Sequence, residues 1–195
     1  MKTVRPSPAR ILSRRETRIS PWVRLIEKEV EFAPGQPPEI YHFLAPRDYI
    51  SILARTPGGL FPVVRQFRPA IEACTWELPA GLLEANEDPE QTCRRELREE
   101  TGLEVKSLTH LGSFFADTGR LENKQHAFFV ETGEPDAAFV PEPGMDLEFV
   151  TFDQIKNLVR SGAFGLQLHI GVLFLYELRI GGLEQLTPRT TSQAA

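Results

Sequence analysis

The sequence predicts an α/β fold, arranged as an α/β/α sandwich around a mixed β-sheet. Three observations lead to this class. Runs rich in β-branched and aromatic residues precede a well-delimited helix at residues 89–101, similar runs follow it, and two more helical segments lie near the C-terminal end. Strands on both sides of an inserted helix, with helices available for both faces of a sheet, favour a layered α/β domain.

The central helix has clear start and stop signals. Asp88 can accept the free N–H groups of a first turn, and Pro89 has its φ preset for the first helical position. Gly102 is a typical left-handed cap, so the helix is expected to end near residue 101. Cys93 and Leu97 are four residues apart and share one face, which we expect to be buried.

The other elements follow from alternation and from turn residues. Strands are expected at residues 22–32, 40–44, 49–54, 60–67, 76–78, 105–115, 125–131 and 149–152. The turn 56–59, Thr-Pro-Gly-Gly, predicts that the strands on either side of it form a hairpin. One helix is expected to start at Thr151 or Asp153 and to run to about Val159, and a last one to cover residues 166–180.

Composition indicates one main domain with two distinct ends. The 195 residues are enough for one core of ordinary size. Residues 1–20 hold six basic side chains and one acid, which predicts a flexible basic arm, with an organelle transit peptide as the alternative. We expect a β-strand extension over residues 21–45, the main domain over 46–182, and a loose tail over 183–195.

Charge and cysteine content narrow the class of protein. The formal net charge of −5 argues against broad electrostatic capture of nucleic acid. No apolar run approaches the roughly 20 residues that a membrane-spanning helix needs, so no membrane association is expected. Cys74 and Cys93 give neither a disulfide framework nor a zinc-binding spacing, and a cytoplasmic location fits best.

One segment carries an unusual density of carboxylates. Glu96, Glu99 and Glu100 are three and four residues apart, so they share one helix face, where like charges repel by a few tenths of a kcal/mol per pair. A divalent cation that takes oxygen ligands is the simplest way to offset this repulsion. The preceding residues are expected to fold back as a loop, with Arg95 paired to Glu87.

The spacing of seven residues in this segment resembles the Nudix box. These residues are Gly81, Glu87, Arg95, Glu96, Glu99, Glu100 and Gly102. The flanking stretches 64–69 (VRQFRP) and 76–81 (WELPAG) resemble the ADP-ribose and ADP-sugar pyrophosphatases of that superfamily. The resemblance covers roughly residues 20–182. It implies the α/β/α sandwich with N-terminal antiparallel strands for dimerisation, and a Nudix hydrolase domain at 46–182.

The resemblance also implies a metal site and its residues. Glu96 and Glu100 are expected as main ligands of Mg2+, or of Mn2+ in its place, with Glu99 as a third. The backbone carbonyl of Ala80 is expected to complete the coordination. Glu99 and Arg95 are also placed among the catalytic residues. In this subgroup the general base resembles a glutamate on a loop after the box, for which Glu148 aligns best.

Other residues are expected to bind substrate or remain as alternatives. Glu142 and Asp146 stay open as the base, because they lie in the same segment as Glu148. Arg68 is expected to contact the diphosphate, since a planar guanidinium can hold two phosphate oxygens at once. Further substrate contacts are expected from three residues, Arg65, Trp22 and Arg120.

The expected function is metal-dependent hydrolysis of a nucleoside diphosphate sugar. ADP-ribose leads, with AMP and ribose 5-phosphate as products. The stretch 116–123 lacks the Pro-Gly common in ADP-ribose enzymes, so GDP-mannose, another nucleotide sugar or a dinucleoside polyphosphate remains an alternative. A Nudix-fold sensor that binds without cleaving is a third possibility. The expected partners are a small-molecule substrate and a second copy of the chain.

Overall fold

The computed structural model describes residues 9–180, which fall into two compact units. The first unit comprises the chain up to Asp48 together with Phe115–Lys124. The second comprises Tyr49–Phe114 and the chain from Gln125 onward. The expected tail at 183–195 lies outside the described residues. No helix within residues 9–180 has the length and apolar character needed to cross a membrane.

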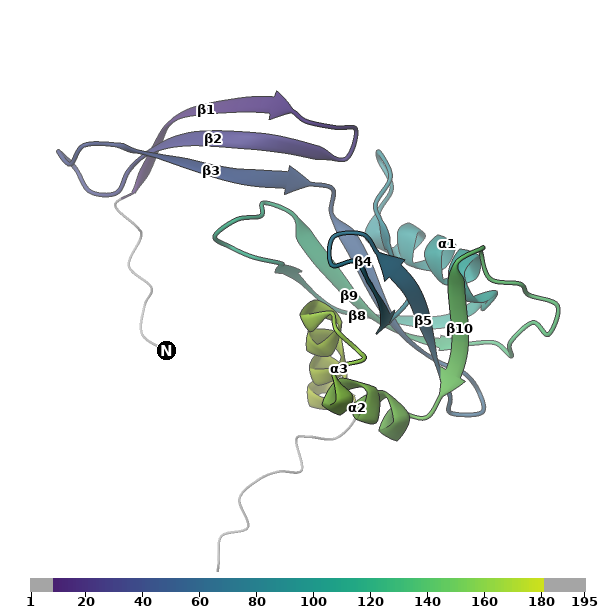
Figure 1. Cartoon of the computed structure of the whole chain (residues 1–195). Coiled ribbons are helices and arrows are strands. Elements are labelled where there is room, and N and C mark those ends of the chain that lie inside the picture. Colours follow the sequence, from purple (N-terminus) through teal and green to yellow (C-terminus); the bar gives the residue numbers. More distant parts are fainter. Residues whose placement is uncertain (1–8, 181–195) are drawn as a thin grey trace, which may run out of the picture. The chain divides into compact units, whose positions relative to one another are not determined.

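The first unit is built on a three-stranded antiparallel sheet (Figure 1). Its strands are β1 (Arg10–Arg18), β2 (Val23–Glu31) and β3 (Glu39–Pro46), in that order. The stretch 115–124 is attached to β3, because the amide of Leu44 donates to the carbonyl of Arg120 at 2.9 Å and the carbonyl of Leu44 accepts from Glu122 at 3.0 Å. Arg14 and Lys28 both pair with the carboxylate of Glu122.

Strand β1 differs from the flexible arm expected over residues 1–20. Its side chains are all exposed, so the sequence has no apolar alternation there to reveal a strand. The pairing comes from β2, with Arg10 opposite Glu31 and Arg18 opposite Arg24. Acids from elsewhere in the unit neutralise the basic side chains, as in the pair between Arg14 and Glu122, 108 residues apart.

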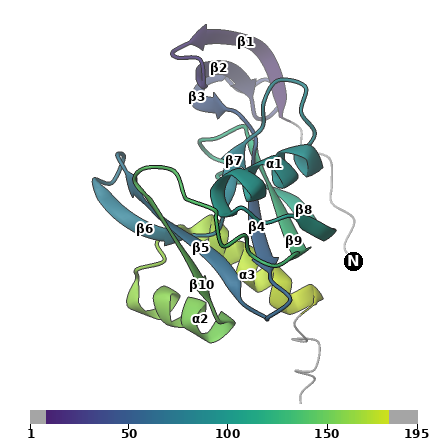
Figure 2. The ribbon, with the colours of Figure 1, turned by 90° about the vertical axis from the view of Figure 1, so that its right-hand side faces the viewer.

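The second unit contains two sheets and three helices. Strands β4 (Tyr49–Arg55), β7 (Ala80–Leu82), β8 (Val105–Phe115) and β9 (Lys124–Thr132) form a mixed sheet in the order β7-β4-β9-β8. Strands β5 (Phe61–Arg68), β6 (Ala73–Glu77) and β10 (Met145–Val150) form an antiparallel sheet in the order β10-β5-β6, seen side by side in Figure 2. The helices are α1 (Pro89–Thr101), α2 (Phe152–Ser161) and α3 (Gln167–Arg179).

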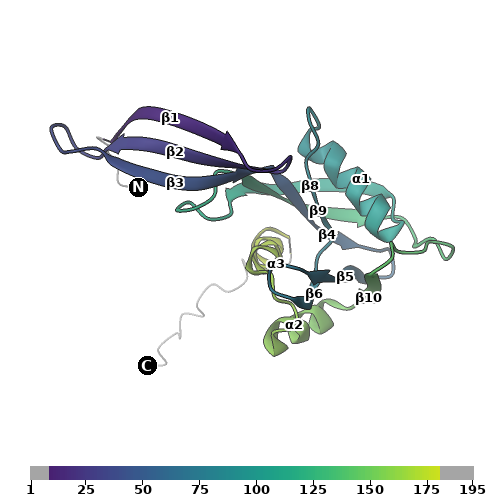
Figure 3. The same ribbon diagram turned by 45° about the horizontal axis from the view of Figure 1, so that its top comes forward.

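The expected α/β/α sandwich is confirmed by two apolar clusters within this unit. One joins Cys93 and Leu97 of α1 to the strands through Ile50, Ile52 and Phe128. The other joins the strands to α2 and α3, with Ile155 and Val172 among its fully buried members. Figure 3 shows α1 on one side of the strands and α2 on the other.

The predicted hairpin between β4 and β5 is wrong, although its turn forms. The amide of Thr56 donates to Leu60 and the amide of Gly59 donates to Thr56, as a tight turn requires. Nevertheless β4 pairs in parallel with β9 over residues 49–55 and antiparallel with β7 over residues 49–51, and none of its strand pairs within residues 9–180 is with β5. Strand β5 therefore joins the other sheet, between β10 and β6.

Candidate active site

Helix α1 has the bounds and the caps that its sequence predicts. The Asp88 carboxylate accepts hydrogen bonds from the amides of Glu90 and Gln91 at 2.8 and 3.0 Å. Gly102 closes the helix with φ 69°. Cys93 and Leu97 are fully buried, as expected. This packing fixes the rotation of the helix, and Glu96 and Glu100 lie beside its buried face, next to β7.

Arg95 links the acidic side chains of the box. Its guanidinium donates to Glu87 at 3.0 and 2.9 Å, to Glu96 at 2.8 Å and to Glu99 at 3.0 Å. The predicted pair with Glu87 is therefore confirmed, and the hydrogen bond with Arg95 lowers the pKa of Glu87 to about 2. Arg95 therefore offsets part of the repulsion among the box glutamates, which was expected to require a bound cation.

Strand β7 approaches the box helix closely at Gly81. An added β-carbon there would lie 1.8 Å from Cδ of Glu96, so only glycine leaves room for this carboxylate. One residue earlier, the backbone amide of Ala80 donates to Oε2 of Glu100 at 2.9 Å. The backbone of β7 thus leaves space for Glu96 at Gly81 and binds Glu100 at Ala80.

Glu100 lies in a poorly solvated environment. Burial raises its pKa to about 8, and the neighbouring charge of Glu96 acts in the same direction. Burial also raises the pKa of Glu96. Two carboxylates that resist ionisation at one place are the arrangement that a bound cation would stabilise.

An ion pair on the antiparallel sheet lies near Glu100. Arg68 donates to both carboxylate oxygens of Glu77, at 2.9 and 2.5 Å, and Thr75 donates to the same carboxylate. The side chain of Glu77 is 2% exposed, whereas that of Arg68 is 41% exposed. Arg68 also interacts electrostatically with Glu100. Because Glu77 takes two of the five guanidinium donors, the others remain for a substrate.

Behind this pair lies a fully buried histidine that sequence reasoning missed. Nδ1 of His169 accepts from the amide of Leu78 at 3.1 Å, so Nε2 carries the proton. Burial lowers its pKa to about 4. The sequence likewise gives Glu77 no role beyond its place in the motif at 76–81. Its signal was an acid at a position flanked by the apolar residues Trp76 and Leu78.

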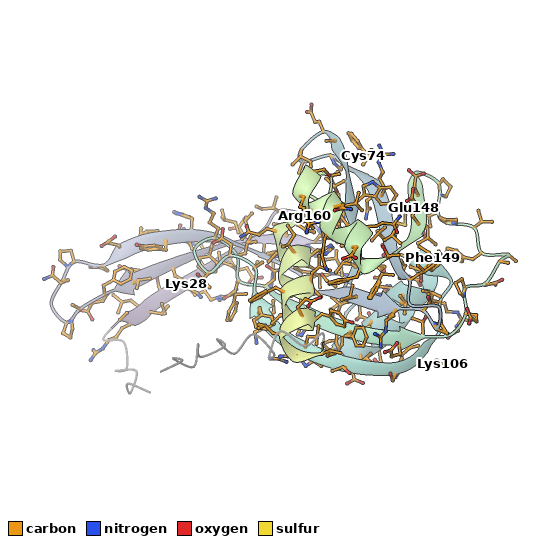
Figure 4. All side chains as sticks on the ribbon, turned by 90° about the horizontal axis from the view of Figure 1, so that it is seen from below. Lys28, Cys74, Lys106, Glu148, Phe149 and Arg160 are labelled. Atoms are coloured by element: carbon orange, nitrogen blue, oxygen red, sulfur yellow. The ribbon has the colours of Figure 1, made fainter. Side chains whose placement is uncertain are left out.

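The structure does not bring Glu148 together with the box carboxylates. Glu148 lies within strand β10, opposite Val63 of β5, and not on a loop. Phe149 packs against the cluster of α1, and Val150 belongs to the cluster of α2 and α3. Side chains alternate along a strand, so Glu148 shares the side of Val150. Figure 4, with α2 and α3 in front, labels Glu148 and Phe149.

Of the two alternatives, only Glu142 precedes the strand. Asp146 is two residues from Glu148 and so points to the same side, where it pairs with Arg65 at 3.2 Å. On this side of the sheet, Arg65 and Glu148 line a cleft of about 780 Å³ together with Cys74 and Trp76. Arg65 is therefore also separated from the box by the sheet.

The two remaining residues expected at the substrate belong to the first unit. Trp22 is 57% exposed, next to the turn that joins β1 and β2. Arg120 contributes its carbonyl to the amide of Leu44 and lines a groove of about 540 Å³ together with Phe32 and Tyr41. The unit thus offers an exposed aromatic ring and a basic side chain.

The donor set of the box suits a hard divalent ion, although the side chains are not arranged as a closed cage. Within residues 9–180, no three His, Cys, Asp or Glu side chains converge as metal ligands. Arg95 holds Glu96 and Glu99 by hydrogen bonds. The fit rests on oxygen donors of Glu96 and Glu100, on the space cleared at Gly81, and on the pKa of Glu100.

This fold, with a glutamate-rich helix against a short strand, agrees with one known domain family. The model of the NUDIX domain matches residues 45–165, and the chain belongs to that family. NUDIX hydrolases generally use divalent metal ions. The family assignment agrees with the spacing of the box.

Several characterised proteins are similar to this chain. An ADP-ribose pyrophosphatase of Bacillus subtilis (strain 168) is 42% identical over 82 residues, which are 42% of this chain and 44% of that protein. An ADP-sugar pyrophosphatase of Mus musculus is 32% identical over 115 residues, 56% of this chain and 53% of that protein. The chain thus spans about half the length of these curated relatives.

A solved crystal structure of an ADP compounds hydrolase shares the fold. The TM-score is 0.76, and the match covers 92% of this chain and 98% of the other at 18% identity. The match therefore includes most of both described units. It supports the fold and says nothing of substrate.

Proposed function

We propose that this protein hydrolyses the pyrophosphate bond of a nucleoside diphosphate sugar, with ADP-ribose as the leading substrate and AMP and ribose 5-phosphate as products. One observation carries the proposal. Glu96 and Glu100 lie together against β7, where Gly81 leaves room for one carboxylate and the Ala80 amide binds the other. The relatives named as ADP-ribose and ADP-sugar pyrophosphatases support this choice of substrate.

The box carboxylates would hold Mg2+, with Mn2+ as a substitute. Glu96 and Glu100 would be the main ligands, with Glu99 and the Ala80 carbonyl beside them. When bound, the ion supplies neutralisation of phosphate charge and a water of lowered pKa. For Glu96 and Glu99 to bind it, Arg95 must give up its hydrogen bonds to them. Its two bonds to Glu87 would then hold the loop before α1 in place.

Arg68 would orient the diphosphate. Glu77 fixes one side of its guanidinium, so the free N–H groups are held in one plane for phosphate oxygens. The same donors would stabilise the charge that develops on the leaving phosphate. A residue held in this way loses little side-chain entropy when substrate binds.

We assign the general base to Glu142. It would take the proton from the attacking water, as a positioned carboxylate can. This choice replaces Glu148, which the alternation of β10 directs to the α2 side. Glu142 lies ahead of that strand, and its carbonyl accepts from the amide of Met145 at 3.0 Å.

We further propose a homodimer formed through the β1–β3 sheet. Its surface exposes large apolar side chains, among them Ile11 at 57%, Leu12 at 51% and Ile40 at 62%. Apolar patches of this kind mark association surfaces. Trp22 and Arg120 would then contribute to substrate binding, and the protein would act in the cytoplasm on small molecules.

The test is a product analysis with a panel of substrates. The protein is incubated with Mg2+ and nucleotide sugars, dinucleoside polyphosphates or nucleoside triphosphates, and products are separated by chromatography. The proposal expects ADP-ribose to be cleaved fastest. Faster cleavage of GDP-mannose or of a dinucleoside polyphosphate would contradict the choice of ADP-ribose as the leading substrate. Binding of ADP-ribose without cleavage of any compound would indicate a sensor.

A further inference from the structure

A cluster of two histidines and one serine lies on the mixed sheet and contains none of the residues assigned to hydrolysis. Oγ of Ser113 lies 3.1 Å from Nε2 of His110 and 2.8 Å from Nδ1 of His126. The two imidazole rings are 6.3 Å apart between centroids and are inclined by 35°. One nitrogen from each ring therefore approaches a single point.

The backbone of β8 is shaped so that this convergence occurs. His110 and Ser113 are three residues apart, and in a regular strand their side chains would point to opposite faces. Gly112 between them has φ 133°, a conformation that L side chains rarely adopt. A β-carbon on Gly112 would also lie 2.6 Å from the ring of Phe114. The irregularity at Gly112 thus brings Ser113 onto the face of His110.

The two histidines are held in different ways. His126 is half-buried in β9, which pairs with the central strand β4 through Ile50. His110 is exposed, but its ring packs on that of Phe128 with the centroids 5.0 Å apart. One imidazole is thus fixed by the sheet and the other is accessible from solvent, so a small ion can enter.

We propose that His110 and His126 form a binding site for a divalent transition-metal ion such as Zn2+, with Ser113 beside the ion. Imidazole nitrogens bind such ions at about 2.0–2.1 Å. The Ser113 hydroxyl would rotate aside to admit an ion at this point, and each nitrogen would then move by only about 1 Å. Water would fill the remaining coordination positions.

The ligand chemistry separates this site from the carboxylates of the box. Imidazole suits Zn2+, Cu2+ and Ni2+, whereas carboxylate and carbonyl oxygens suit Mg2+. The cluster provides two nitrogen donors and one hydroxyl oxygen. Mg2+ is therefore not expected to compete for it. The proposal does not depend on the hydrolytic activity.

The test measures Zn2+ binding by the full chain in the presence of saturating Mg2+. Isothermal titration calorimetry is expected to show a Zn2+ site in the wild type. His110→Gln and His126→Gln are each expected to weaken it by about tenfold or more, because loss of a direct ligand costs at least as much as loss of a residue that supports one. The matched control is His42→Gln, an exposed histidine paired with Glu27 in the first unit.

A spectroscopic measurement gives a second readout. Bound Cu2+ is expected to show coupling to two nitrogens by electron paramagnetic resonance in the wild type, and to fewer in His110→Gln. If His126→Gln fails to fold, His110→Gln decides, because His110 is exposed. Equal Zn2+ affinity in the wild type and a folded His110→Gln, or a similar loss in His42→Gln, would overturn the proposal.

Discussion

A β-carbon placed on Gly81 would lie 1.8 Å from Cδ and 1.9 Å from Oε1 of Glu96. Because Gly81 has no side chain, the carboxylate of Glu96 from α1 can occupy the space beside it. The φ of Gly81 is not positive, so conformational freedom is not the reason for glycine here. Glycine is needed because a side chain at this position of β7 would collide with the Glu96 carboxylate.

Gly81→Ala is expected to reduce the rate of hydrolysis by about 10- to 100-fold, because the methyl group displaces the Glu96 carboxylate from β7. Since the end of the glutamate side chain can swing away, the melting temperature should change little. Gly58→Ala is the control, as its β-carbon would meet only Thr56 at 3.8 Å. Equal rates in the two variants would show that the contact has no catalytic role.

Arg68→Ala is expected to destabilise the protein by about 3 kcal/mol, because it leaves the buried Glu77 carboxylate without its partner. Arg65→Ala on the same strand is the matched control. Its pair with Asp146 is exposed on both sides, and such pairs contribute about 0–1 kcal/mol. Urea unfolding of both variants measures the difference. Similar losses of unfolding free energy in the two variants would contradict the claim that the buried Glu77 carboxylate depends on Arg68.

The free energy of unfolding is expected to depend on pH through His169. Its pKa is about 4 in the folded protein and 6.5 when exposed, so between these values the unfolded chain binds a proton that the folded chain does not. Stability should therefore fall as pH decreases from 6.5 to 4, by up to about 3 kcal/mol, and this contribution should level off below pH 4.

His169→Gln provides the comparison, since its amide oxygen can accept from Leu78 without titrating. Urea unfolding at several pH values should show a shallower loss of stability in this variant than in the wild type. Parallel curves would mean that His169 does not carry this dependence.

Glu142→Gln is expected to lower kcat by about 10²- to 10⁴-fold, the usual contribution of a general base, while Glu148→Gln changes it little. The reason is the position of the two residues relative to β10. Glu148 shares the side of Val150 in the cluster of α2 and α3. Steady-state kinetics with ADP-ribose compares the two variants. The reverse order would restore Glu148 as the base.

The parts of the fold that sequence predicted are those specified locally. Helix α1 begins after Asp88 and ends before Gly102, as predicted, because its caps lie within the segment itself. The turn at Thr56 formed for the same reason. The partner of β4 did not follow from that turn, since β4 pairs with β9 from Tyr49↔Gln125 onward, and pairing at such a separation leaves no local signal.

The site shows the same division. The carboxylates of α1 and the pair of Arg95 with Glu87 followed from helical spacing. Glu77 and His169 did not, because their roles arise only where β6, β5 and α3 meet. Glu148 was assigned to a loop because the pairing of β10 with β5 spans 81 residues between Arg65 and Asp146.

The central claim is that Glu100 binds the metal ion needed for hydrolysis, and Glu100→Gln tests it most directly. Burial penalises the charge of Glu100, so the uncharged amide should fold as well as the wild type, with an equal or higher melting temperature without metal. Cleavage of ADP-ribose with Mg2+ should fall by about two orders of magnitude or more. Wild-type cleavage rates in a folded Glu100→Gln would contradict the account.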